Sequence, residues 1–389
     1  MPLMLHNATL LTPLRTVDDA AVVITDNGRI AYAGPMHEAP RARGQRLDLD
    51  GRTIVPGLID VHVHGGHGVT FGVPGRVAED LRAYSQWVTR FGVTGFLSSV
   101  AAPDPPTLLQ VVRESVAALQ EGLPGAEGLG LHLEGPLLNP EKKGAFSPDW
   151  LRTPSLDEVD VLLEAGKGWI RQVTLAPELP GARAVAAKLR VAGVVAALGH
   201  SNADYALASA ALRTDFTHVT HTFNAQRALQ QREPGVWGAV LASERVTAEL
   251  IADTVHVHPG TMKVLLRCLG PQRVVLVTDA MAAAGLSDGE YDLVGEAVTV
   301  RNGRATLADG TIAGGTATLN ECVRHLHEDV CAPLAQAVRM ATLNPARALG
   351  FGRRLGSLMV HKDANLAVID ADVRVSLTLV RGKVVYGQP

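Results

Sequence analysis

Between residues 54 and 350, short apolar runs alternate with longer stretches rich in alanine and leucine. The runs have the length of buried strands, and most are followed by a segment with helical character, such as 76–91 and 153–166. Polar residues crowd at the ends of these runs, which favours a closed parallel (β/α)8 barrel, the TIM barrel, over an open doubly wound sheet. The eight runs lie at 54–61, 93–100, 128–135, 170–177, 194–200, 216–223, 248–255 and 273–280.

Both ends of the chain have a different pattern, in which short strand-like runs are joined by turns. Near the N-terminus, Asn27–Gly28 is a two-residue hairpin signal. We therefore expect an α/β protein in which residues 1–53 and 355–389 form a small β-sandwich domain built from both chain ends, with the barrel at 54–354. A Gly- and Thr-rich excursion at 291–315 predicts a hairpin with a loop near the mouth of the barrel.

Composition limits the partners and the compartment. The 389 residues carry a net charge of −3, so no global field favours nucleic acid or an anionic membrane. No window offers the roughly 18 uninterrupted apolar residues of a membrane span, and the first residues lack a signal-peptide pattern. The three cysteines form neither a CxxC pair nor an even framework, as in proteins of a reducing cytosol. We expect a cytoplasmic protein that binds neither nucleic acid nor membranes.

Histidines and acids gather at the ends of the predicted strands, where a TIM barrel holds its active site. His62 and His64 lie two apart in the first run, so both side chains point to one face and together can ligate a cation. Glu134 ends an apolar strand, where an unpaired carboxylate is costly to bury, and a ligand role explains its presence. His200 and His221 end the fifth and sixth runs. With Glu134 they supply nitrogen and oxygen donors and leave room for water, as in a catalytic zinc-type site.

Asp279 ends the eighth strand, where it can take a proton from water activated by a cation and return it to a leaving nitrogen. The alternative for this aspartate is a helix N-cap. Two further histidines are interpreted as structural. His132 shares a face with Glu134, and His218 lies three residues before His221, which predicts that it points to the opposite side.

These motifs together resemble a known family. HVHG after an apolar strand, followed by strand-end histidines and a final aspartate, resembles the amidohydrolase superfamily. From about residue 50 to the C-terminus the chain resembles, more narrowly, the N-acetylglucosamine-6-phosphate deacetylases. That resemblance implies a metal-dependent hydrolase that releases acetate from N-acetylglucosamine 6-phosphate. The blocks that carry it, in order, are PGLIDVHVHG, LHLEGPLLNPEKKGAF, GHSNADY, THTFNA, REPG, ADTVHVHP, VTDAM and ATLNPARALG.

The resemblance assigns metal ligands by position. Glu134, His200 and His221 match the family's principal ligands, while His62 and His64 match the first motif of members that hold a second metal. One or two divalent cations per subunit are therefore implied. Zinc is expected first, with iron, manganese or cobalt as alternatives, because such donor sets accept several metals.

The resemblance also implies roles toward the substrate. Asp279 matches the catalytic acid/base, and His256 matches the histidine that contacts the substrate and polarises the acetyl carbonyl. Asn224 and Ala225 match positions that contact the sugar phosphate, and Ala145 of KKGAF is expected beside them.

Arg232 of REPG resembles an arginine that binds the phosphate in the neighbouring subunit's site, which implies a homodimer. Two positions depart from the family. Phe146 stands where histidine is common, and Gln226 where methionine is usual, so the phosphate contact and the pocket rim are expected to differ.

Three alternatives remain at this level. The same chemistry on N-acetylgalactosamine 6-phosphate differs in the orientation of one hydroxyl. A dihydroorotase-like or dipeptidase-like amidohydrolase would commonly carry a carboxylated lysine on the fourth strand, and run 170–177 contains no lysine. A non-catalytic scaffold with a decayed site would be expected to lose ligands, whereas this chain retains them.

Overall fold

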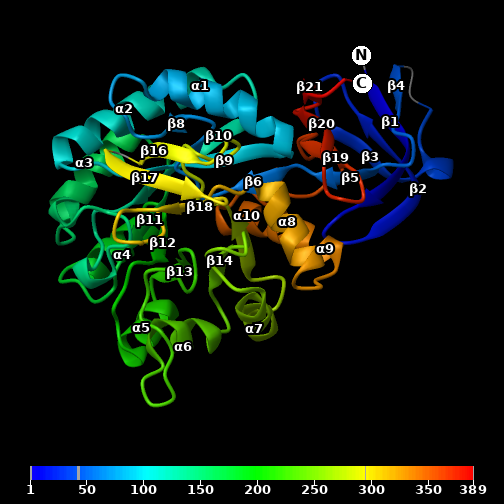
Figure 1. Cartoon of the computed structure of the whole chain (residues 1–389). Helices are drawn as coiled ribbons and strands as arrows, with labels where there is room; N and C mark the ends of the chain where they lie inside the picture. The colour runs from blue at the N-terminus through cyan, green and yellow to red at the C-terminus, as the bar shows by residue number, and fades with distance from the viewer. Residues whose placement is uncertain (1, 42–43, 294, 389) are drawn as a thin grey trace.

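The computed structural model describes residues 2–41, 44–293 and 295–388, and it confirms the parallel barrel (Figure 1). Its strands are hydrogen-bonded side by side in chain order. Where the last strand meets the first, the amide of Asp279 donates to the carbonyl of His62 at 2.9 Å, and the Thr278 hydroxyl donates to the Asp60 carboxylate at 2.6 Å. The barrel strands are β6 (Leu58–Asp60), β9 (Val93–Val100), β10 (Glu127–Glu134), β11 (Ile170–Leu175), β12 (Val195–Leu198), β13 (Phe216–Val219), β14 (Thr247–Ile251) and β15 (Val274–Val277).

Helices follow the barrel strands and surround the sheet (Figure 1). Polar residues directly before them define their starts: Asp104 accepts the amide of Thr107 at 2.9 Å, and Asp204 accepts the amide of Leu207 at 2.8 Å. Within the described ranges, no helix combines the length and apolar character that crossing a bilayer requires. The α-helices are α1 (Val77–Trp87), α2 (Pro105–Glu121), α3 (Leu156–Gly166), α4 (Ala182–Val191), α5 (Tyr205–Arg213), α6 (Gly235–Leu241), α7 (Pro259–Leu269), α8 (Leu319–Glu328), α9 (Leu334–Met340) and α10 (Leu343–Ala348), and the 3₁₀ turns are η1 (Met36–Glu38), η2 (Val88–Phe91), η3 (Pro140–Lys142) and η4 (Pro148–Trp150).

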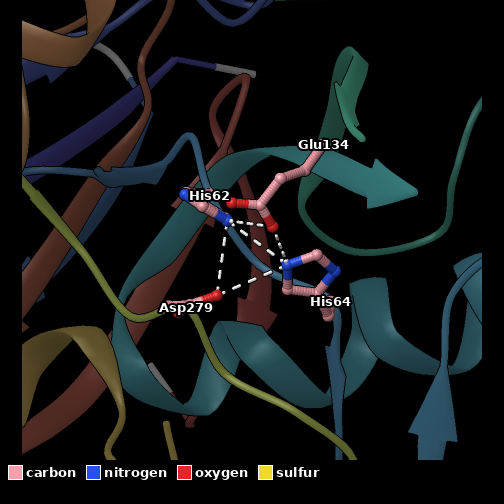
Figure 2. A group of neighbouring side chains, drawn as sticks. All are labelled: His62, His64, Glu134 and Asp279. Carbon is pink, nitrogen blue, oxygen red and sulfur yellow. Dashed lines mark hydrogen bonds and ion pairs between the residues drawn. The ribbon is translucent and has the colours of Figure 1, made fainter. Parts of the chain in front are cut away.

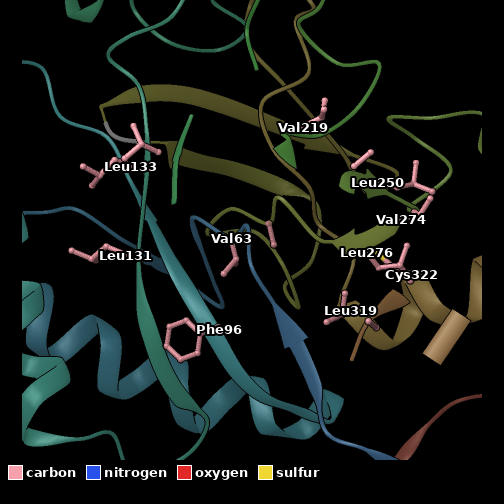
Figure 3. Packing of buried hydrophobic residues seen from close by; sticks show 14 of the residues in the cluster. Val63, Phe96, Leu131, Leu133, Val219, Leu250, Val274, Leu276, Leu319 and Cys322 are labelled. Carbon is pink, nitrogen blue, oxygen red and sulfur yellow. The ribbon is translucent and has the colours of Figure 1, made fainter. Parts of the chain in front are cut away.

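The alternation of side chains along the strands separates an aliphatic layer from a polar interior. In β10, Leu131 and Leu133 join the main apolar cluster with residues of the surrounding helices (Figure 3). Their neighbours His132 and Glu134 are equally buried but lie on the opposite face, inside the barrel. The polar residues of the site therefore stand on strands that the aliphatic layer fixes from outside.

The small domain is one continuously hydrogen-bonded sheet made from both chain ends, in the order β21-β20-β19-β5-β1-β2-β3, with β4 paired to β1. β3 at one end of this order and β20 near the other end contribute to one apolar cluster, so the sheet curls around its own core. The turn that contains Asn27–Gly28 joins β2 and β3, but the connection spans residues 25–29 and is longer than the predicted two-residue hairpin. Its strands are β1 (Leu3–Leu11), β2 (Thr16–Ile24), β3 (Ile30–Pro35), β4 (Gln45–Asp48), β5 (Thr53–Pro56), β19 (Leu366–Ile369), β20 (Val375–Val380) and β21 (Lys383–Tyr386).

The chain passes from this sheet to the barrel at Gly57, slightly later than the expected boundary after residue 53. The first apolar run is split, because β5 pairs with β1 and β19 whereas β6 pairs with β9. A Cβ at Gly57 would lie 2.2 Å from the Thr94 hydroxyl oxygen, so the close passage between the two sheets requires glycine.

Two small antiparallel sheets lie beside the barrel. The excursion after β15 forms β16 (Gly289–Leu293), β17 (Glu296–Arg301) and β18 (Arg304–Thr306), and Leu293 and Glu296 face the cavity described below. The second pair is β7 (Gly65–Gly66) and β8 (Val69–Thr70). The predicted hairpin near the mouth is therefore a three-stranded sheet.

Candidate metal centre and substrate cavity

Glu134, at the end of β10, is the centre of the site, and each of its carboxylate oxygens faces a different set of histidines. Oε1 lies 3.3 Å from His200 Nε2 and 3.0 Å from His221 Nε2, and these two nitrogens are 3.0 Å apart. We call Glu134, His200 and His221 the His200 group. Its donor atoms lie within 4.8 Å of one another, close enough to share one cation.

The other oxygen of Glu134 belongs to a second cluster, which we call the His62 group: His62, His64, Glu134 and Asp279 (Figure 2). Oε2 lies 3.1 Å from His62 Nε2 and 2.8 Å from His64 Nε2. Asp279 Oδ1 closes the cluster at 3.3 Å from His62 and 3.4 Å from His64. Glu134 thus bridges two groups of donors at one rim of the barrel.

Turns in the backbone orient these side chains. Three of the residues each lie two positions after the end of a strand and have positive φ angles: His200 with 46°, His221 with 24° and Asp279 with 49°. Such conformations are costly for residues other than glycine and persist where the surroundings impose them. His62 and His64 also follow β6, which ends at Asp60, so they do not lie within the strand as the two-residue spacing suggested.

The donor atoms fit a divalent cation. Glu134 Oε1 is buried and has no hydrogen-bond partner among the described residues, although two imidazole nitrogens lie within 3.3 Å of it. An unpartnered buried carboxylate oxygen is costly, and a cation shared with those nitrogens would remove the cost. Two imidazoles and a carboxylate are the donor set of catalytic zinc and related transition-metal sites.

Hydrogen bonds on the far side of the rings leave the facing nitrogens free to ligate. His200 Nδ1 donates to the carbonyl of Lys142 at 2.7 Å, and His62 Nδ1 donates to Glu249 at 2.8 Å. When Nδ1 carries the proton, the lone pair lies on Nε2, the atom that faces Glu134 in both residues. Burial raises the pKa of Glu134, but the charge that His62 carries before a cation binds, together with the imidazoles that face the carboxylate, holds this pKa well below its usual range, so the carboxylate is ionised. His62 would release the proton on Nε2 when it ligates a cation.

His132 takes no part in either group. Its Nδ1 and Nε2 bond to the hydroxyls of Ser99 at 2.9 Å and Thr174 at 2.8 Å. Burial, together with the positive charge of His62, lowers the pKa of His132 to about 3, so its ring is neutral. The structural interpretation of this residue agrees with these contacts.

Asp279 and His256 face the substrate side of the site. Both line a cavity of about 370 Å³ above the two groups, within the ~300–1,000 Å³ typical of small-molecule sites. His256 Nδ1 donates to Asp253 at 2.7 Å. Burial lowers the pKa of His256, but the hydrogen bond and charge of Asp253 raise it above the usual value, which favours an imidazolium that can donate from Nε2.

The residues predicted to contact the substrate lie in two different places. Asn224, Ala225 and Ala145 line the cavity, whereas Arg232 is exposed on the loop between β13 and α6 and lies outside the cavity of its own chain. Among the described residues, Lys142 is the only lysine or arginine that lines the cavity.

The two residues that depart from the family pattern, Phe146 and Gln226, also lie in different places. Phe146 lines the cavity and meets the edge of the His200 ring, with the ring centroids 5.5 Å apart. Gln226 is buried instead of lying at the rim, because its amide donates to the carbonyl of Thr220 at 2.9 Å and its oxygen accepts from the amide of Phe223 at 3.3 Å. Gln226 therefore holds the turn after β13 together.

Comparison with known proteins decides the family. The model described as "Amidohydrolase family" matches residues 53–385. This chain belongs to the amidohydrolase family.

Two similar relatives of this amidohydrolase have been named for different sugars. The N-acetylglucosamine-6-phosphate deacetylase of Bacillus subtilis is 33% identical over 387 residues, which cover 99% of this chain and 97% of the relative. The N-acetylgalactosamine-6-phosphate deacetylase of Escherichia coli is 36% identical over 374 residues, covering 96% and 97%. Among solved structures, a mutant N-acetyl-D-glucosamine-6-phosphate deacetylase of Mycobacterium smegmatis in complex with N-acetyl-D-glucosamine-6-phosphate is 37% identical, with a TM-score of 0.91 and coverage of 99% of both chains.

Sequence reasoning missed two acids of this amidohydrolase. Glu249 lies inside run 248–255, where its position in an apolar strand is the same signal that singled out Glu134. Asp253 lies in the same run, three residues before His256. His218 does not point away from the site as predicted: it donates to Glu249 at 3.0 Å inside the barrel. The three-residue spacing misled because the strand ends at Val219, so strand alternation does not extend to His221.

Proposed function

We propose that this protein is a metal-dependent deacetylase that hydrolyses the N-acetyl amide of N-acetylglucosamine 6-phosphate to glucosamine 6-phosphate and acetate. The observation that carries the proposal is the bridging carboxylate of Glu134, with two sets of cation donors at the floor of a cavity sized for a small molecule. The names of the relatives support the substrate class.

Two positions could hold a divalent cation. The His200 group is the principal position, and the His62 group is the second, so each subunit would take one or two ions. Zinc is the first expectation, with iron, manganese or cobalt as alternatives. A bound cation supplies the Lewis acidity that makes water a usable nucleophile and polarises the amide carbonyl.

The protein's own groups would manage the protons. Asp279 is ionised, because the charge of His62 and a hydrogen bond from His64 outweigh the effect of burial and lower its pKa. Its carboxylate can accept a proton from the attacking water and deliver it to the departing amine nitrogen. His256, held by Asp253, would donate from Nε2 to the acetyl oxygen as negative charge develops there.

Binding of the sugar phosphate would use a second set of residues. Asn224, Ala225 and Ala145 would contact the sugar, and Arg232 would reach the phosphate from the neighbouring subunit of a homodimer. Its exposed position outside its own cavity is consistent with that role. Arginine suits it because a guanidinium engages phosphate through two parallel hydrogen bonds.

A cytoplasmic location is part of the proposal. The described structure leaves all three cysteines, Cys268, Cys322 and Cys331, as free thiols, which supports a reducing compartment.

The experiment is an acetate-release assay on purified protein with added zinc. N-acetylglucosamine 6-phosphate, N-acetylgalactosamine 6-phosphate and unphosphorylated N-acetylglucosamine are compared. We expect the highest kcat/KM for the first substrate and a large loss without phosphate. A higher kcat/KM for N-acetylgalactosamine 6-phosphate would identify that sugar phosphate as the preferred substrate. Absence of acetate release from both sugar phosphates would refute the proposed deacetylase activity.

A further inference from the structure

β14 carries a buried carboxylate, Glu249, that the proposed chemistry does not use. It is 0% exposed and accepts four hydrogen bonds. Oε2 accepts from His62 Nδ1 at 2.8 Å and from the amide of His221 at 3.0 Å. Oε1 accepts from Gln172 Nε2 at 2.8 Å and from His218 Nε2 at 3.0 Å. These bonds use all the lone-pair sites of a carboxylate, so Glu249 has no acceptor site left for a cation or a substrate.

The bond to His62 determines which nitrogen of that ring can ligate. Because Nδ1 carries its proton and donates it in a hydrogen bond to Glu249, the lone pair of Nε2 can point to a cation held by Glu134 and Asp279. The ring itself is completely buried. Without an acceptor behind it, the imidazole would lose both its orientation and its preferred tautomer.

The bond to His221 is of another kind. Glu249 holds only the main-chain amide of that residue, at the turn with φ 24°, and does not touch its ring. The other histidine of the His200 group, His200, is oriented by the carbonyl of Lys142. Glu249 therefore acts on the ligating ring of one group and only on the backbone of the other.

We propose that Glu249 is a positioning residue that sets cation affinity at the His62 group, while the His200 group holds its cation largely without it. This inference rests on the cation-binding part of the proposed function. It predicts that the two positions can be separated by changing one residue that ligates neither ion.

The test is a titration of chelator-stripped protein with Zn²⁺ in competition with a chromophoric chelator. Wild-type protein is expected to bind zinc in two affinity classes, and His64→Ala identifies the class that belongs to the His62 group. Glu249→Gln should raise the Kd of that class by about 10- to 100-fold and leave the other within about threefold. Glu249→Asp, which keeps the charge but shortens the side chain, is a second variant with the same expected direction.

Glu249→Gln can be accommodated without disrupting the fold. The buried oxygen of Gln172 has no partner among the described residues, so an amide flip there would accept one hydrogen of the new NH₂ group, and His218 could accept the other in its second tautomer. His62 Nδ1 then donates to a neutral amide oxygen instead of a carboxylate, which lowers the basicity of the ligating Nε2 and weakens cation binding. The matched control is Asp253→Asn, which removes another buried carboxylate from the Nδ1 of a histidine, His256, and should leave both zinc classes unchanged.

Three results would overturn the inference: wild-type protein that binds a single zinc, equal losses in both classes, or no change in either. Acetate release by the wild type is measured in parallel. Hydrolysis with unchanged zinc binding in Glu249→Gln refutes only the role of Glu249, whereas selective zinc loss without wild-type hydrolysis refutes only the deacetylase.

Discussion

The His62 group and the His200 group share Glu134 but are built in different ways. The His62 ring is buried and backed by another buried side chain, Glu249. The His200 ring is instead supported by a main-chain carbonyl, that of Lys142. Both histidines of the His200 group stand on strand-end turns with positive φ, a feature that the His62 group shares only at Asp279. The His62 ring thus depends on a side chain of the barrel interior, and the His200 ring on the main chain of a loop that borders the cavity.

This difference suggests why one position can be altered without the other. Side-chain support is lost by a single substitution, because the acceptor disappears with the residue. Main-chain support survives substitution, because every residue supplies a carbonyl. We therefore expect the His62 group to be the more easily lost of the two.

The largest effect is expected from Glu134→Gln, which affects both groups at once. Zinc content should fall at both positions, and turnover should fall by at least about 1,000-fold, because the shared carboxylate contributes to each donor set. Metal analysis and acetate release measure both. Glu141→Gln changes another carboxylate that lines the cavity outside both groups and should keep the zinc. Full zinc occupancy in Glu134→Gln would contradict the bridging role.

Asp279→Asn should separate chemistry from metal binding. Asp279 is a donor of the His62 group but not of the His200 group, so zinc at the His200 group should remain, whereas zinc affinity at the His62 group should fall. We expect kcat to fall by about 100- to 10,000-fold through loss of the proton-transfer group. Near-normal turnover would show that another group moves the proton.

Asp253→Asn tests whether a buried carboxylate also controls a histidine outside both groups. Asp253 raises the pKa of His256, so the imidazolium persists to higher pH in the native protein. If donation from His256 is needed, kcat/KM falls as pH rises through that pKa. Removing the carboxylate lowers the pKa, and the fall should begin at lower pH. A pH profile with an unmoved alkaline limb would exclude this role.

The smallest effect on the metal groups is expected from Arg232→Ala, because Arg232 lies outside the cavity of its own chain. KM should rise roughly tenfold or more with little change in kcat, since a charged hydrogen bond common to ground and transition states is lost. Mixed dimers of Arg232→Ala and Glu134→Gln chains should regain one complete site. Absence of complementation would indicate that Arg232 does not act across subunits.

The pattern of the chain determined the architecture and the positions of the site's main donors. Eight apolar runs in one order predict a parallel barrel, and strand ends in such a barrel meet at one rim. Glu134, His200 and His221 could therefore be grouped before any distance was known. The local spacing of His62 and His64 was equally informative, although both residues follow the strand instead of lying within it.

The tertiary structure alone decided which side chains support those donors. His62 and Glu249 are 187 residues apart, and no local period relates them. Their contact depends on how adjacent and opposite strands are staggered around the barrel, and on turns such as that at His221, where strand alternation ends. A sequence marks a residue as polar in an apolar strand, but only the closed barrel determines which partner it meets.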